Sequence, residues 1–135
     1  MEQTLFIIKP DAVKRRLVGE IIKRFENKNF KIIKLKMFAF TNDVAKEFYS
    51  IHKEKSFFNE LISFITSGAA VAVIIEGDHA IQTTRIMVGS TKSFDASPGS
   101  IRGDYSLGIT SNIIHASDSK RSFEIESNII FNSLK

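Results

Sequence analysis

The segment AAVAVIIEG at residues 69–77 is a continuous apolar run that ends at Gly77. An apolar run of this length, rich in valine and isoleucine and closed by glycine, predicts a buried strand. A second run, TLFIIK at residues 4–9, has the same character and stops before Pro10, which we expect to form a turn with Asp11. Two such strands predict a sheet that is covered by helices.

The segments around these two strands alternate between helical and strand-like periodicity. The order that they predict, β-α-β-α-β-α-loop-β-α, resembles a ferredoxin-like sandwich of the α/β (α+β) class, with a four-stranded antiparallel sheet. A length of 135 residues predicts one domain, residues 1–135. The pattern predicts helices at 19–28, 42–51, 58–66, 79–88 and beyond 117, further strands at 30–40 and 112–116, and a long loop at 89–111 before the last strand.

The strand expected at 30–40, FKIIKLKMFAF, mixes lysines with apolar residues. Strict alternation would place Ile32, Lys34, Lys36, Phe38 and Phe40 on one face. Paired aromatics beside lysines are a weak match to strands that bind single-stranded RNA, so a nucleic-acid-binding module stays open as an alternative function.

Composition sets the broad class of protein. Apolar residues make up 43% and charged residues 25%, which is ordinary for a globular chain. Cysteine is absent, which excludes disulfides and thiol nucleophiles and fits a reducing compartment. The sequence shows neither a signal peptide nor a membrane-spanning run, so we expect a cytoplasmic protein. The net charge of +4 is compatible with an anionic partner, although scattered surface lysines explain it equally well.

The stretch NIIHASDSKRSFEIE at residues 112–126 carries the candidate chemistry. His115 follows a short apolar run and precedes a helix that we expect Ser117 or Asp118 to cap. The start of a helix offers unpaired N–H groups and a partial positive charge, which favour a phosphate. A lone histidine at such a place more often has a structural role, so the pattern alone leaves both interpretations open.

Glu126 falls on an apolar face of the same helix. A helical wheel places it on a broad arc, and a buried carboxylate needs a hydrogen-bond donor. The imidazole of His115 is a candidate donor, and a carboxylate bound to one ring nitrogen would leave the other nitrogen free as a nucleophile. A position at the rim of the apolar arc is the alternative for Glu126. The arc is formed by Phe123, Ile125, Ile129, Ile130 and Leu134.

Five blocks of sequence, taken together, resemble the nucleoside diphosphate kinase family. NIIHASDS at 112–119 is similar to that family's signature, which is usually written N-x-x-H-G-S-D. The other four blocks occur in the family's order, so the resemblance spans nearly the whole chain. They are IIKPDAV at 7–13, VGEIIKRFE at 18–26, RIMVGST at 85–91 and PGSIRGDY at 98–105.

This resemblance implies a ping-pong phosphotransferase that maintains nucleoside triphosphate pools. The γ-phosphoryl group of a nucleoside triphosphate, typically ATP, would pass to His115 and then to a nucleoside diphosphate. The resemblance also implies Mg²⁺ held mainly by the nucleotide phosphates, without a protein metal site, and a homo-oligomer, most often a hexamer and in some bacterial members a tetramer. Nucleic acid and membranes are not expected as main partners.

The resemblance assigns a role to each matching residue. Around the nucleophile, Glu126 and Ser117 would orient His115, and Lys9 and Tyr49 would lie beside the phosphates. For the nucleotide, Arg85, Arg102 and Thr91 would bind phosphate, Asn112 the ribose, and Phe57 and Ile109 the two faces of the base. His52 and His79 match no signature, and we interpret them as surface or structural residues. Asp11 and Asp118 are interpreted as a turn residue and a helix-start residue.

Some positions depart from the family's usual pattern. Ala116 replaces the glycine after the histidine, Ala12 replaces a glycine near the start, and the loop reads TKSF at 91–94 without the common proline. Alanine would be strained at these sites if the backbone were left-handed. A catalytically inactive relative is therefore the third functional class, although the intact histidine, lysine, arginines and carboxylate argue against it.

Overall fold

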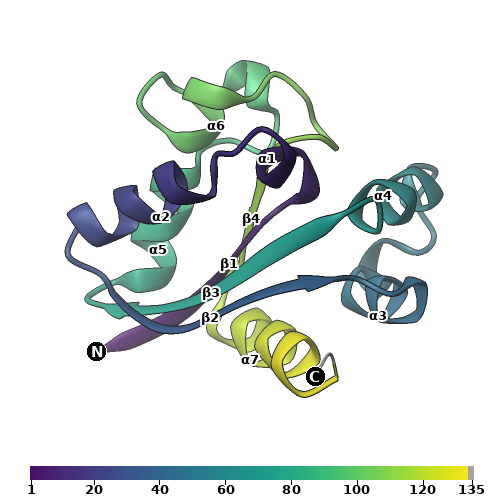
Figure 1. Ribbon diagram of the computed structural model, residues 1–135, viewed down its shortest axis with the longest axis horizontal. Helices are drawn as coiled ribbons and strands as arrows, with labels where there is room; N and C mark the ends of the chain where they lie inside the picture. The colour runs from purple at the N-terminus through teal and green to yellow at the C-terminus, as the bar shows by residue number, and fades with distance from the viewer. Residues whose placement is uncertain (134–135) are drawn as a thin grey trace.

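The order of the strands in the sheet differs from their order in the sequence. The computed structural model describes residues 1–133 and contains four strands in the order β2-β3-β1-β4, with every neighbouring pair antiparallel (Figure 1). The strands are β1 (Glu2–Ile8), β2 (Lys31–Ala39), β3 (Ala69–Gly77) and β4 (Ile114–Ala116). This confirms the predicted four-stranded antiparallel sheet and the ferredoxin-like arrangement.

Helices cover both faces of this sheet. On one face lie α3 (Asn42–Phe48), α4 (Phe58–Ile65), and α7 (Lys120–Asn128), which continues into the π-helical turn η3 (Ile129–Ser133). On the other face lie α1 (Pro10–Lys14), α2 (Val18–Asn27), α5 (Ala80–Val88) and α6 (Ile101–Tyr105). Two short 3₁₀ helices, η1 (Ser50–His52) and η2 (Ser93–Asp95), complete the fold. The two apolar clusters between sheet and helices explain why residues 5–8 of β1 and 69–75 of β3 are apolar on both faces.

The first turn of the chain differs from its prediction. Pro10 does not form a turn after strand β1. It is the first residue of helix α1. Proline fits this position because its missing N–H would have no partner there and its φ is already helical. Asp11 therefore lies in the first turn of a short helix.

The predicted face of β2 is wrong for Ile32, because the strand contains a bulge, and is confirmed for Phe38 and Phe40, which pack together. The register with β3 shifts between Ile32 and Lys34, so Ile32 packs with the α2 cluster while Phe38 packs with the α3 cluster on the opposite face. An extra residue reverses the alternation of side chains across the sheet. Phe38 and Phe40 are buried under α3, which removes the exposed aromatic pair that an RNA-binding interpretation would need.

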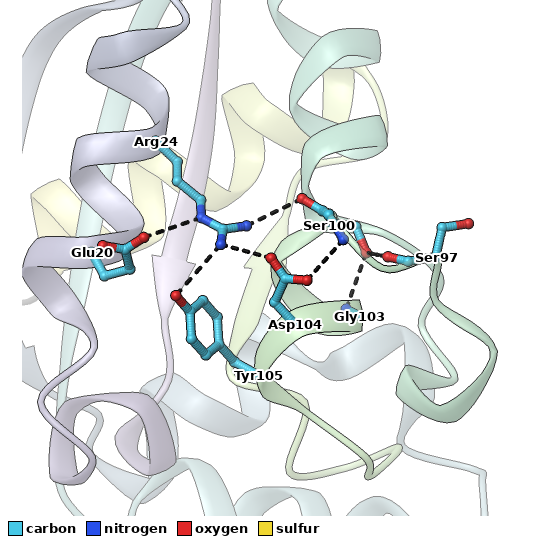
Figure 2. A network of polar contacts seen from close by, with 8 residues as sticks. Glu20, Arg24, Ser97, Ser100, Gly103, Asp104 and Tyr105 are labelled. Atoms are coloured by element: carbon cyan, nitrogen blue, oxygen red, sulfur yellow. Dashed lines mark hydrogen bonds and ion pairs between the residues drawn. The ribbon is translucent and has the colours of Figure 1, made fainter.

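The predicted loop at 89–111 contains structure that the sequence pattern did not reveal. Ser100 caps helix α6, and Arg24 on α2 joins that helix through Asp104 at 2.7 Å (Figure 2). Arg24 also contacts Glu20 at 3.5 Å and the carbonyl of Gly99 at 3.2 Å. These contacts hold the segment before β4 against the helical layer.

The last helix also departs from its prediction, at its first residues and at Ile125. Ser119 caps α7 by accepting the N–H of Ser122, so neither Ser117 nor Asp118 is the cap. Ile125 is half exposed because it lies two residues from Phe123, roughly 200° around a helix that turns about 100° per residue. Ile129 and Ile130 are buried as predicted. Leu134, which was placed on the same arc, lies outside the described residues.

Candidate active site

His115 occupies the middle of the short edge strand β4. It pairs with Ile7 of β1, and cross-strand partners place their side chains on the same face of a sheet. The imidazole therefore points toward the α3 face, where its centroid lies 5.3 Å from the ring of Phe48 and 6.4 Å from that of Tyr49. Its flanking residues, Ile114 and Ala116, point into the opposite apolar cluster. The strand thus fixes the histidine between two buried anchors.

Glu126 and Ser117 complete a hydrogen-bonded group with this histidine. One carboxylate oxygen, Oε1 of Glu126, lies 2.9 Å from Nε2 of His115 and accepts the hydroxyl of Ser117 at 2.7 Å. A carboxylate accepts hydrogen bonds, so Nε2 carries the proton in the neutral ring and the lone pair lies on Nδ1. The predicted contact between Glu126 and His115 is present.

Lys9 lies at the end of β1 with only 5% of its surface exposed. Its Nζ donates to Oδ1 of Asn112 at 2.7 Å. Burial and the nearby charge of Arg102 lower the pKa of Lys9 to about 7, and the charge of Asp11 opposes this shift. A buried ammonium group with so little hydration is strongly stabilised when an anion approaches.

Arg102 is buried and bound to backbone. Its guanidinium donates to the carbonyl oxygens of Asn112 at 3.3 Å, Gly89 at 3.0 Å and Ile114 at 2.6 Å. Burial and the charge of Arg85 lower its pKa to about 10. The side chain therefore joins the loop after α5 to β4 and keeps a positive charge between them.

Arg85 and Thr91 lie on the solvent side of the same region. Arg85, on α5, donates to the carbonyl of Ala116 at 3.2 Å, directly after the histidine. The backbone oxygen of Thr91 accepts the side-chain amide of Asn112 at 3.3 Å. Both residues line an open pocket of about 890 Å³, which also includes Asp118. His115 does not line that pocket, so the contacts among side chains locate the site better than the pocket does.

A row of rings leads away from His115 across α3 and α4. The centroids of Tyr49 and His52 lie 6.5 Å apart, and those of His52 and Phe57 lie 5.6 Å apart. Phe57 is 40% exposed at the start of α4, which leaves ring surface available to a ligand. Ile109 is exposed on the loop after α6, and its pairing with Phe57 across a base stays a prediction.

Two polar atoms in this row have no protein partner. The hydroxyl of Tyr49 and Nδ1 of His52 are both buried without a hydrogen bond among the described residues. Burial and the charge of Glu126 raise the pKa of Tyr49, while burial and Lys55 lower that of His52. The interpretation of His52 as a surface or structural residue missed this placement. Its spacing of three residues from Tyr49, one turn of helix, was the available signal.

The two alanines that replace family glycines are not strained. Ala12 lies within helix α1 and Ala116 within strand β4, whereas positive φ angles occur at other residues. A methyl side chain suits both conformations, so these departures do not disturb the backbone of the site.

The fold and site together define an α/β sandwich in which a histidine bound to a carboxylate lies close to arginine and lysine side chains, the class of site that suits phosphate. Comparison with known proteins agrees with this class. The family described as nucleoside diphosphate kinase matches residues 2–135, and the chain belongs to that family. It is an enzyme of the nucleoside diphosphate kinase type.

Individual relatives match over nearly their whole length. The nucleoside diphosphate kinase of Thermoplasma volcanium is 56% identical over 131 residues, which cover 97% of this chain and 89% of that protein. The halophilic enzyme of Halobacterium salinarum, solved in complex with CDP, is 39% identical with a TM-score of 0.95, covering 99% of this chain and 91% of that one. The Aquifex aeolicus enzyme is 43% identical with a TM-score of 0.93, covering 97% and 95%.

Members of this family use a divalent cation. Over residues 1–133, no group of three or more histidine, aspartate or glutamate side chains is placed to hold a metal ion. The site instead collects Lys9, Arg85 and Arg102, which suit phosphate oxygens.

Proposed function

We propose that this chain transfers the γ-phosphoryl group of a nucleoside triphosphate, typically ATP, to a nucleoside diphosphate through a phosphohistidine at His115. The lone pair on Nδ1 attacks the γ-phosphorus, the bond from that phosphorus to the β-phosphate oxygen breaks, and the diphosphate leaves. A second diphosphate then takes the phosphoryl group by the reverse step. The hydrogen bond between Nε2 and Glu126 is the observation that carries this proposal.

The cationic side chains support the same reaction. Charge on the transferring phosphoryl group is spread over its equatorial oxygens, so fixed cations and donors stabilise the transition state. We assign this role to Arg85, Arg102 and Lys9, with Thr91 as a hydroxyl donor. Tyr49 supplies a buried hydroxyl that has no hydrogen-bond partner within residues 1–133, and we assign it a phosphate contact.

For the nucleoside part, we assign the ribose to Asn112 and the base to a slot between Phe57 and Ile109. Stacking on apolar and aromatic side chains tolerates any base because every base has a π-face. His52, between Tyr49 and Phe57, adds a ring nitrogen on the path from base to phosphates, and this nitrogen has no hydrogen-bond partner in the part of the chain that the structure describes. The complex of the Halobacterium salinarum relative with CDP is consistent with a nucleotide here.

We assign Mg²⁺ as the divalent ion, bound to the phosphates of the nucleotide. When bound, it neutralises phosphate charge and holds the phosphate chain in one conformation. Lys9, Arg85 and Arg102 would contact phosphate oxygens of the nucleotide that carries the ion.

The direct test is a phosphoenzyme measurement on the wild-type chain. Brief incubation with ATP and Mg²⁺ should add one acid-labile phosphoryl group to the intact protein mass, and peptide mapping should place it on His115. Adding CDP should remove the group and form CTP. Folded protein that binds ADP but acquires no phosphoryl group would refute the proposed route.

The pKa of Lys9 predicts proton uptake when a nucleotide binds. Near pH 8, Lys9 is mostly neutral in the free enzyme because its pKa is about 7. Phosphates favour the charged ammonium and raise that pKa, so binding should take up as much as one proton and weaken as the pH rises above 7. Titration calorimetry of Mg·ADP near pH 8, in buffers of different ionisation enthalpy, measures the uptake.

The Lys9→Gln variant is the matched control, since it keeps a polar side chain of similar reach but cannot titrate. It should lose the proton uptake while other titrations persist. Equal uptake by both proteins would show that the proton goes elsewhere.

We also propose a homo-oligomer, a hexamer in preference to a tetramer. Strand β2 lies at one edge of the sheet and exposes Leu35 and Met37 at 52% and 62%. An edge strand with exposed apolar side chains is a surface that pairs with another chain. Light scattering should give a multiple of the chain mass of 15.2 kDa, and Met37→Lys should shift it toward smaller species. A wild-type monomer would contradict this proposal.

We place the protein in the cytoplasm, in agreement with its lack of cysteine. None of the helices described over residues 1–133 is long and apolar enough to cross a membrane. Nucleotides, rather than nucleic acid, are the proposed ligands of the basic site.

A further inference from the structure

Ile113 has a backbone conformation that its side chain disfavours. Its φ is 62°, and it is fully buried in the apolar cluster next to β4. A positive φ is a genuine outlier for a β-branched residue, because its Cβ substituents crowd the backbone. Arg16, Asn29 and His79 also have positive φ, but none of them is β-branched. Such strain persists only where the surroundings enforce it.

Two hydrogen bonds from one short segment hold this residue. The N–H of Ile113 donates to Oδ2 of Asp11 at 3.2 Å, and its carbonyl accepts the N–H of Lys9 at 2.8 Å. Asp11 and Ile113 are 102 positions apart in the chain, so the carboxylate reaches well beyond its own helix. The other oxygen of Asp11, Oδ1, is buried without a partner among the described residues. A carboxylate that only began helix α1 would not need this placement.

The strained residue lies between two parts of the proposed site. Asn112, just before it, binds Nζ of Lys9, and His115 follows two residues later. The carbonyls on either side of Ile113, those of Asn112 and Ile114, both accept from Arg102. A change in the backbone at Ile113 would therefore move the lysine and amide pair relative to the nucleophile.

We infer that Asp11 is a positioning residue, whose carboxylate holds Ile113 at its positive φ and thereby sets the Lys9–Asn112 pair against His115. This inference rests on the proposed phosphohistidine route. Asp11 has a second effect that can be tested separately, because its negative charge raises the pKa of Lys9 and so favours the charged ammonium.

A double-mutant cycle with glycine and alanine tests the geometric part. Glycine at 113 adopts positive φ freely, whereas alanine resists it, and both remove nearly the same side chain. In the Asp11→Ala background, the kcat of the Ile113→Gly variant should be at least roughly tenfold higher than that of the Ile113→Ala variant, because residues in contact couple strongly. With Asp11 present, the two variants should differ by less than about threefold, since the carboxylate then enforces the conformation.

The Asp11→Asn variant separates charge from geometry. Its side-chain oxygen still accepts the N–H of Ile113, so kcat near pH 6 should stay within about threefold of wild type. Loss of the negative charge lowers the pKa of Lys9, so the fall of kcat/KM with rising pH should begin at a lower pH than in wild type. A purely structural role would leave the pH profile unmoved.

The same variants are compared in thermal midpoint and in Mg·ADP affinity, so that loss of folding is recognised. Equal kcat for the glycine and alanine variants without Asp11, or wild-type kcat in folded Asp11→Ala, would overturn the inference. Absence of the wild-type phosphoenzyme would instead refute the proposed function. In that case, coupling between positions 11 and 113 in ADP affinity and thermal midpoint would still decide whether Asp11 holds this segment.

Discussion

Replacing His115 by alanine is expected to abolish the phosphoenzyme and lower kcat by at least about 10⁴-fold, because a covalent route loses its nucleophile. Binding of Mg·ADP should change little, since Lys9, Arg102 and Phe57 remain. The fold should also persist, because the imidazole is partly exposed and its neighbours on β4 fill the core. Quenched-flow assays with ATP, followed by intact mass, measure both the rate and the modification.

The control for this variant is His79→Asn. His79 is exposed before α5 with a φ of 52°, a conformation that asparagine tolerates well. This variant should keep a wild-type rate of phosphoenzyme formation. A phosphoryl group that still appears on His115→Ala would contradict the assignment, and His52 would then be the first residue to map.

The sheet could be predicted from sequence because its central strands carry unambiguous patterns. The apolar runs at 4–9 and 69–77 each predict a buried strand, and these two strands form the centre of the sheet. The bulge in β2 could not be predicted, because KIIKLK offers apolar residues at adjacent positions and either alternation fits it. Only the packing of Ile32 under α2 and of Phe38 under α3 decides the register.

The helix starts show a similar limit. Ser117 and Ser119 are both good caps by residue type, and the run SDS does not choose between them. The structure chooses Ser119 because the hydroxyl of Ser117 is already bound to Glu126. Helix α6 was missed because five residues with a glycine inside give no helical period.

The predicted side-chain contacts agree with the structure where the partners are close in sequence. His115, Ser117 and Glu126 share twelve residues of chain, and a helical wheel places Glu126 on the apolar arc of the helix that follows His115. The bond between Lys9 and Asn112 spans 103 positions and depends on the pairing of β1 with β4, which periodicity cannot supply. The strained φ of Ile113 likewise has no signature in an apolar run.

Replacing Glu126 by alanine should lower the rate of phosphoenzyme formation by about 10³-fold, and by glutamine about 10- to 100-fold, in line with the loss of one preorganised electrostatic group. The imidazole gains positive charge as Nδ1 takes the phosphoryl group, and the carboxylate on Nε2 stabilises that charge. Glutamine keeps the acceptor oxygen for His115 and Ser117 but loses the negative charge. Alanine loses the charge, the orientation of the ring and the preference for one tautomer.

Ser117→Ala provides the matched comparison, because its hydroxyl and His115 share the same oxygen of Glu126. If Ser117 acts only by orienting that carboxylate, Ser117→Ala alone should lower the rate of phosphoenzyme formation about tenfold. In the Glu126→Ala background, the same change should leave the rate almost unchanged. Single-turnover rates are measured for the wild type, the two single variants and the double variant. Urea unfolding gives the folded fraction of each protein, so that the rates are compared at equal folded fraction. Additive losses would mean that Ser117 acts on the phosphoryl group by another route, and Glu126→Ala with more than a tenth of wild-type activity would remove the carboxylate from the mechanism.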